Sequence, residues 1–227
     1  DIKVELVRLL SRASGIGGMA GGQALDLQAE SDTPGEAGII RLQAMKTGAL
    51  LRFACEAGAV IGGATSEDRE RLAEYGSAVG LAFQIADDVL TRGWKPSLGA
   101  FSAAYDGEDL DAAVLSVGLS GLLAPTDERF ISTVAIIERE LRNGPTVYRY
   151  QSDDGLPGRE GGFNLMTSWL IDAMALTGRR EEAEGLFKEL CQLAGAVGLM
   201  AEQFDPDTGQ ALGNVPRAYA HLGVINN

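Results

Sequence analysis

Apolar residues recur at helical spacing through the first ninety positions of the chain. The pattern predicts an amphipathic segment over residues 2–10 and helices over about residues 19–30, 36–59 and 66–90. Ser66 is the expected N-cap of the last helix, because Glu67 and Asp68 then lie in its first turn. Glycines at 21 and 22 lie inside the second helix and predict a close backbone approach there.

The rest of the chain carries more turn residues between its apolar segments. Helices are expected near residues 110–122, 128–141, 163–176, 180–197 and 214–225, with a short extended piece at 147–150 and a loop at 152–158. Strand and helix patterns do not alternate along the chain, so a parallel sheet is not expected. The sequence therefore predicts an all-α protein.

The composition narrows the class of protein further. With 45% hydrophobic and 22% charged residues, the chain is expected to be globular, and 227 residues allow one large or two small domains. No apolar stretch is long enough for a membrane span. The formal net charge of −13 argues against a nucleic-acid or anionic-membrane partner. Cys55 and Cys191 lie in helical apolar patterns and are expected to be buried thiols, as in a cytoplasmic protein.

Prolines and aromatic residues are unevenly distributed along the chain. Six of the seven prolines and eleven of the fourteen aromatic residues follow position 93. This shift suggests a boundary near Gly93. The sequence begins at Asp1 without a signal region, so we expect a fragment or a processed product.

A group of polar residues interrupts the apolar helices of the first part. Gln84, Asp87 and Asp88 fall on one face of a helix, where two carboxylates call for a cationic partner. Magnesium is the natural candidate, and Lys46 with Thr47 would offer a phosphate group a cation and a hydroxyl donor. On spacing alone, an acidic helix end and a lysine that reaches into solvent are the favoured interpretation.

The order of these motifs resembles that of trans-prenyl diphosphate synthases, the families that make farnesyl and geranylgeranyl diphosphate. The resemblance covers about residues 1–90 and rests on residues 18–27, 46–50 and 80–88. It implies part of the helical isoprenoid-synthase bundle, with magnesium ions that clamp an allylic diphosphate. Carried over, Lys46, Thr47 and Gln84 would contact the diphosphate, and Asp87, with Asp88 beside it, would bind magnesium.

Two departures from the prenyl-synthase pattern matter for activity. Thr91 stands where the family has the third aspartate of its second aspartate-rich motif. The first aspartate-rich motif has no counterpart in the sequence. The resemblance therefore implies half of an active site.

Two further residues match the family. Gln23 and Asp26 belong to a stretch that, in that family, faces the cavity where the diphosphate binds.

From residue 92 onward the sequence resembles a second family, the glucoamylase-like and trehalase-like glycoside hydrolases of family 15. The matching segments recur in order, at residues 92–94, 99–101, 109–112, 127–130, 137–141, 148–150, 154–163, 168–170, 177–179 and 200–206. The resemblance implies about half of an (α/α)6 toroid. Carried over, Glu202 would be the general base of an inverting hydrolase, whereas its position alone suggests an exposed glutamate after a helix.

The resemblance also places other residues of this part. Trp169, Tyr148 and Tyr150 would line a sugar cleft, although their spacing also fits a core role. The general acid of that family lies upstream and has no counterpart here. His221, the single histidine, is expected to be a hydrogen-bonded structural residue.

Together these patterns predict a composite of two incomplete enzyme parts, over residues 1–90 and 91–227. We expect either a fusion or truncated chimera in which neither chemistry is complete, an enzyme completed by a partner chain, or a non-catalytic helical scaffold. A diphosphate or a saccharide is the expected ligand. Truncated helix faces would leave apolar surface exposed, so a homo-oligomer is expected.

Overall fold

The computed structural model describes residues 1–29, 31, 35–152 and 160–226. The chain divides into two compact units, Asp1–Asp88 and Val89–Asn227, each of which is described by itself. Helices dominate both units, and the strands are only two residues long, so the protein is all-α in class. Most of the loop predicted at 152–158 lies outside the described residues.

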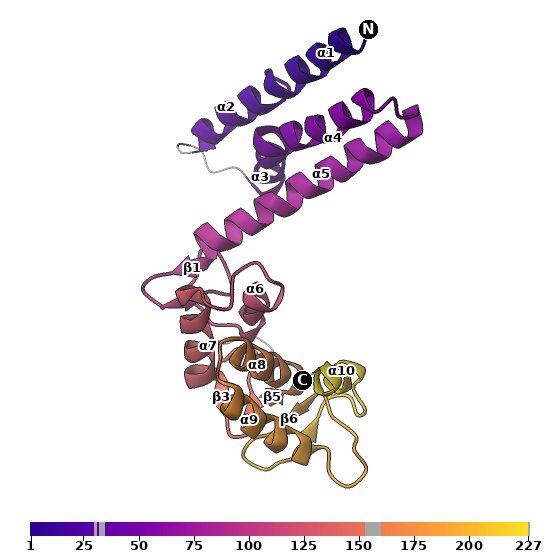
Figure 1. Ribbon diagram of the computed structural model, residues 1–227. Helices are drawn as coiled ribbons and strands as arrows, with labels where there is room; N and C mark the ends of the chain where they lie inside the picture. Colours follow the sequence, from indigo (N-terminus) through magenta and orange to yellow (C-terminus); the bar gives the residue numbers. More distant parts are fainter. Residues whose placement is uncertain (30, 32–34, 153–159, 227) are drawn as a thin grey trace. The chain divides into compact units, whose positions relative to one another are not determined.

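The first unit is a set of helices that run alongside one another (Figure 1). They are α1 Ile2–Ser14, α2 Met19–Ala29, α3 Glu36–Gln43, the π-helical turn η1 Ala44–Gly48, α4 Ala49–Ile61 and α5 Ser66–Asp88. The helix expected over 36–59 is therefore α3, η1 and α4 in succession, with Lys46 and Thr47 in the π-helical turn. A π-helical turn inside an α-helix is a frequent feature of functional sites.

Glycines allow the helices of the first unit to approach closely. A Cβ atom on Gly22 would lie 2.3 Å from the backbone nitrogen of Lys46, and one on Gly80 would lie 2.7 Å from the Cα atom of Gly48. The close approach expected at residues 21–22 is thus confirmed. The expected capping residue was wrong by one position, because Thr65 Oγ1 accepts the Asp68 N–H at 3.2 Å and Ser66 is already helical.

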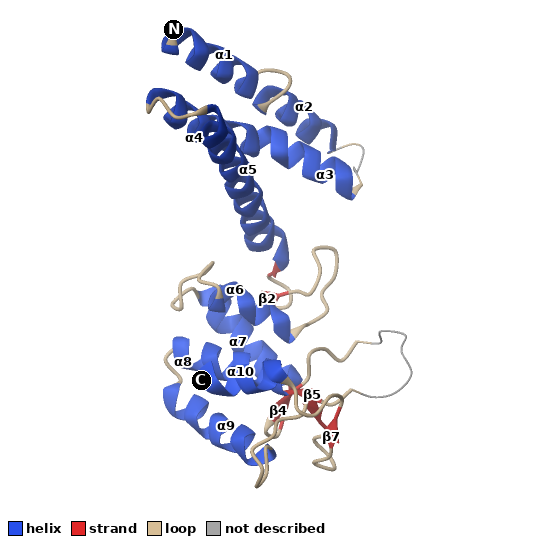
Figure 2. Cartoon of the chain, turned by 90° about the vertical axis from the view of Figure 1, so that its right-hand side faces the viewer, coloured by secondary structure: helices blue, strands red, loops and turns tan. Residues whose placement is uncertain are grey.

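The second unit combines helices with short antiparallel strand pairs. Its elements are η2 Val89–Gly93, β1 Trp94–Lys95, β2 Ala100–Phe101, η3 Ala112–Leu115, α6 Ser116–Leu119, α7 Glu128–Leu141, β3 Arg142–Asn143, β4 Thr146–Val147, β5 Gly162–Phe163, α8 Asn164–Leu176, α9 Arg180–Leu193, β6 Gln203–Phe204, β7 Ala211–Leu212 and α10 Ala218–Asn226. The strands pair as β1–β2, β3–β4 and β5–β6–β7. Figure 2 shows β4, β5 and β7 grouped on one side of the helices of this unit.

Three of the helices expected in this part are shorter than the pattern suggested. The segment 110–122 contains only the 3₁₀ turn η3 and the four-residue α6, and Gly121 follows with a φ of +80°. Helix α9 ends at Leu193, before Gly195 with a φ of +60°. Left-handed backbone of this kind ends a helix and favours glycine. Helix α10 begins at Ala218 rather than near 214.

The second unit has a dense apolar core centred on α7 and α8. Phe101, Phe130, Leu170 and Met174 are almost completely buried there. Buried threonines tie this core to the strands. Thr133 Oγ1 accepts the Phe101 N–H at 3.2 Å and donates to the Arg129 carbonyl at 2.7 Å.

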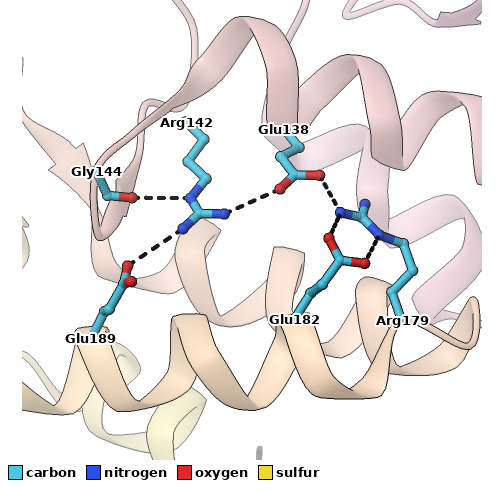
Figure 3. Close-up of polar contacts among 6 residues, drawn as sticks. All are labelled: Glu138, Arg142, Gly144, Arg179, Glu182 and Glu189. Carbon is cyan, nitrogen blue, oxygen red and sulfur yellow. Dashed lines mark hydrogen bonds and ion pairs between the residues drawn. The ribbon is translucent and has the colours of Figure 1, made fainter.

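A network of ion pairs connects the end of α7 to α9 (Figure 3). The Glu138 carboxylate pairs with Arg142 at 3.1 Å and with Arg179 at 2.7 Å. Arg179 also pairs with Glu182 at 2.6 Å, and Arg142 reaches Glu189 at 3.4 Å. The hydrogen bonds that the Arg179 guanidinium donates to Glu182 and Glu138 raise the pKa of Arg179 above its usual range.

Surface features complete the description of the two units. Cys191 is exposed and Cys55 is half-buried, so the expectation of two buried thiols was wrong for Cys191. Both cysteines are free thiols. None of the helices that the structure describes is long and apolar enough to cross a membrane.

Candidate functional site

Glu202 lies immediately before strand β6 and is held by neighbouring backbone on both sides. Its carbonyl accepts the Asn164 N–H at 3.2 Å, and its own N–H donates to the Asn214 carbonyl at 3.0 Å. The Asn164 side chain, which is completely buried at the start of α8, donates to the Ala201 carbonyl at 2.8 Å. These bonds join the start of α8, the residues before β6 and the segment before α10 around Glu202.

The Glu202 carboxylate has two further partners. One oxygen pairs with Arg217 Nη2 at 3.3 Å, and the other accepts the Asn214 N–H at 3.3 Å. Gly213 lies directly under the carboxylate, because a Cβ atom there would come within 2.8 Å of Glu202 Oε2. The side chain is 23% exposed, so the carboxylate is oriented by these contacts but remains open to solvent.

Glu202 and Trp169 line the same cavity, which has a volume of about 260 Å³. The remaining lining residues come from α8, α10 and the segments beside them: Ala113, Arg149, Phe163, Leu165, Met166, Arg217, Tyr219 and Ala220. Among these described lining residues, Glu202 is the single acidic one. The structure therefore brings together two of the four residues that the sequence assigned to a sugar site, Glu202 and Trp169.

Such a cavity has the chemistry of a saccharide site. An aromatic ring offers an apolar surface to a sugar face, whereas the carboxylate and the arginines offer hydrogen-bond partners to hydroxyl groups. A carboxylate held by an arginine and an amide N–H can also take a proton from water. Tyr148 packs instead against the apolar core, and Tyr150 lies under the Arg149 guanidinium, 5.5 Å away.

The residues assigned to a diphosphate site lie in the first unit. Lys46 Nζ pairs with Asp26 Oδ2 at 2.5 Å, and the Asp88 carboxylate accepts a hydrogen bond from the Gln43 amide. Gln84 lines a separate cavity of about 640 Å³ between α1, α4 and α5. Lys46, Thr47, Asp87 and Asp88 are not among the described residues that line it.

Magnesium binding stays a prediction for this unit. Among the described residues, no group of three or more His, Cys, Asp or Glu side chains is arranged to hold a metal ion. Asp87 and Asp88 are a smaller set, and magnesium usually takes one or two carboxylates together with water and phosphate oxygens. The pair therefore fits that donor chemistry only when a phosphate ligand supplies the rest.

Several partners of Glu202 carried no sequence signal that singled them out. Arg217, Asn214 and Gly213 meet the carboxylate only because the chain turns back between β7 and α10. Asn164 falls at the start of the helix predicted near 163–176, and no local signal links it to Glu202. Their contacts depend on tertiary structure, which spacing along the chain does not encode.

The sequence model of Glycosyl hydrolases family 15 matches residues 54–227, more than half of the chain. The chain belongs to this family. Within this family 15 chain, a second model, Polyprenyl synthetase, matches residues 2–93. The two matches overlap at residues 54–93. Both resemblances read from the sequence are thus confirmed.

The relatives of this family 15 chain include a trehalase and a farnesyl diphosphate synthase. A trehalase from Thermoplasma acidophilum is 38% identical over 147 residues, which cover 64% of the chain but 25% of the trehalase. A farnesyl diphosphate synthase from Geobacillus stearothermophilus is 32% identical over 144 residues, which cover 63% of the chain and 47% of the synthase. The chain thus spans about a quarter of the one relative and about half of the other.

A solved structure supports the fold. The family 15 chain aligns to a structure titled "Glycosidase Wild Type" with a TM-score of 0.57 and 20% identity, over 79% of the chain and 50% of the glycosidase. At this identity the likeness concerns the fold alone.

Proposed function

We propose that the chain joins a prenyl-synthase part, residues 1–90, to the general-base part of a family 15 hydrolase, residues 91–227, and that neither active site is complete. The observation that carries this proposal is the cavity that Glu202 and Trp169 line together, with no second acidic residue among its described lining residues. A saccharide is the ligand class that this cavity fits best.

The incomplete set of carboxyl groups determines the expected chemistry. Inverting hydrolysis uses one carboxylic acid to protonate the leaving oxygen and a second carboxylate, roughly 6.5–9.5 Å away, to activate water. Glu202 would take the proton from water, and Trp169 would support the sugar ring. Because the described residues that line the cavity include no second acid, the glycosidic oxygen would leave unprotonated. The chain should therefore bind sugar without cleaving it.

The experiment compares binding and turnover on glucose, trehalose and maltose. Titration calorimetry or ligand-observed NMR should detect binding that Trp169→Phe weakens about tenfold, since the smaller phenyl ring offers less contact area than the indole and lacks its N–H donor. The matched variant Trp94→Phe should leave binding unchanged, because Trp94 packs against Phe101 instead of lining the cavity. Release of glucose that Glu202→Gln abolishes would show a complete hydrolase and overturn the proposal.

The first unit is proposed to keep the diphosphate contacts of a prenyltransferase. Lys46, Thr47 and Gln84 would contact the diphosphate, and Asp87 and Asp88 would hold magnesium. When bound, magnesium neutralises the charge of a departing diphosphate. The magnesium that one carboxylate pair could hold would leave much of that charge uncompensated, so elongation of geranyl diphosphate with isopentenyl diphosphate should be absent. Robust magnesium-dependent elongation that disappears in Asp87→Ala would contradict this expectation.

The same proposal includes a homo-oligomer and a cytoplasmic location. Ile2, Val4, Val7 and Leu10 of α1 are all exposed, and so are Leu81, Phe83 and Ile85 of α5. Apolar surface of this kind is normally covered by another chain. Sedimentation velocity should show an oligomer that Val7→Glu dissociates, whereas Arg71→Glu on α5 should leave it intact. The free thiols of Cys55 and Cys191 are in the usual state of cysteine in the cytoplasm.

A further inference from the structure

His221 bridges two backbone groups on either side of the candidate base. Its Nε2 atom lies 3.2 Å from the Met200 backbone nitrogen, and its Nδ1 atom lies 2.8 Å from the Arg217 carbonyl oxygen. An amide N–H can only donate a hydrogen bond and a carbonyl oxygen can only accept one. The imidazole must therefore be neutral, with its proton on Nδ1 and its lone pair on Nε2.

The two bridged groups belong to the residues that place the Glu202 carboxylate. Met200 lies two residues before Glu202, and the Arg217 side chain pairs with Glu202 at 3.3 Å. The Arg217 N–H also donates directly to the Met200 carbonyl at 2.9 Å. Met200 and Arg217 are thus joined twice, once directly and once through His221.

The two residues of the Arg217–Glu202 ion pair are therefore held by contacts from two different helices, α8 and α10. Asn164 holds Ala201 and Glu202 from the α8 side, through its side-chain amide and its backbone N–H. His221 holds Met200 and Arg217 from the α10 side. Met200 is 2% exposed, so its N–H would lack a partner if the imidazole were removed.

We propose that His221 is a positioning residue, which acts as the Nδ1–H tautomer to hold the Arg217–Glu202 pair in place. The proposal rests on the proposed function, in which the Glu202 cavity binds a saccharide. His221 is not among the described residues that line this cavity, so its effect must pass through Arg217 and Met200.

The first test measures the tautomer directly on the whole chain. Because His221 is the single histidine, nitrogen-15 imidazole spectra contain one pair of ring signals. At neutral pH we expect a protonated Nδ1 and an unprotonated Nε2. A proton on Nε2, or rapid exchange between both tautomers, would overturn the proposal, and this measurement needs no variant.

The second test separates positioning from general stability. His221→Gln keeps an acceptor near the Nε2 position, whereas His221→Phe fills the space without one. The carboxyl carbon signal of Glu202, assigned by its loss in Glu202→Gln, should shift in His221→Phe and return in His221→Gln. Glucose affinity should fall about tenfold in His221→Phe and recover in His221→Gln.

Thr133→Val provides the matched control. Thr133 forms the same kind of bridge, from the Phe101 N–H to the Arg129 carbonyl, and is not among the described residues of the Glu202 cavity. It should lower stability without moving the Glu202 signal. A Glu202 signal that His221→Phe shifts no more than Thr133→Val would overturn the proposal. If wild-type protein binds no glucose, the proposed function fails, yet the Glu202 signal still tests His221.

Discussion

At the scale of single residues, Gly213 shows how closely the Glu202 carboxylate is packed against the backbone. Its φ is +70°, and a Cβ atom would lie 2.8 Å from Glu202 Oε2 and 3.0 Å from Glu202 Cβ. Gly213→Ala should therefore cost about 1–2 kcal/mol of backbone strain and also push the carboxylate away from the Asn214 N–H. We expect sugar binding to weaken in proportion to that displacement.

Gly209 is the matched control for this prediction. Its φ is +69°, but a Cβ atom there would meet no atom within 4 Å. Gly209→Ala should lose a similar free energy of unfolding and keep wild-type sugar binding. Urea unfolding and glucose titration of both variants measure the two effects separately. Equal loss of binding in the two variants would show that strain, rather than contact with Glu202, is responsible.

Contacts between residues that are far apart in the sequence are what the sequence alone could not predict. Glu202 and Trp169 belong to ordered family motifs, so their assignment to one site required no knowledge of the fold. The Arg217 contact required it, because the loop from Glu202 to α10 passes through β6 and β7 before returning. The bridging role of His221 could likewise not be predicted from the sequence, since Met200 lies 21 positions away along the chain.

At the scale of elements, α7 is the helix whose bounds the sequence predicted best. Residues 128–141 were expected and Glu128–Leu141 is observed, because both ends carry local signals. Asp127 caps the start by accepting the Arg129 N–H at 2.9 Å. Segment 110–122 lacked comparable signals and contains two glycines, so its apolar spacing suggested a longer helix than the one formed.

The Asp127 cap predicts a pH dependence of stability. Hydrogen bonds from the Arg129 side chain lower the pKa of Asp127, so the folded value lies below the unfolded one. Its stabilisation is therefore complete above the unfolded pKa of about 3.9 and is lost as the pH falls through the folded pKa. Asp127→Asn should cost about 1 kcal/mol at pH 7. Urea unfolding should show this difference shrinking below about pH 4, whereas a constant difference would exclude a charge effect.

The ion-pair network between α7 and α9 predicts a second effect at this scale. Glu138 pairs with two arginines and its side chain is 22% exposed, so Glu138→Gln leaves both cations partly uncompensated. We expect a loss of about 1 kcal/mol that 1 M NaCl reduces. Glu140→Gln on the same helix is the control, because its pair with the adjacent Arg139 is largely exposed. Similar losses in both variants would argue against a role for the network.

At the scale of the whole molecule, the two units differ in how much apolar surface they bury. Twenty-two of the 28 buried hydrophobic residues that the structure describes lie in Val89–Asn227. The first unit instead holds 15 of the 24 large hydrophobic residues that are exposed. The helical periodicity of the first ninety residues predicted that this unit is helical but did not reveal this difference, because burial depends on which helix faces pack against a partner.

This difference predicts that the two units unfold separately and in a fixed order. Burial of apolar surface is the main favourable term in folding, so the first unit should unfold at the lower denaturant concentration. Trp94 and Trp169, the two tryptophans of the chain, both lie in the second unit. Tryptophan fluorescence therefore reports the second unit alone, whereas far-ultraviolet circular dichroism reports the helices of both. In urea, the circular-dichroism signal should begin to fall before the fluorescence changes, and coincident transitions would show instead that the two units fold as one cooperative structure.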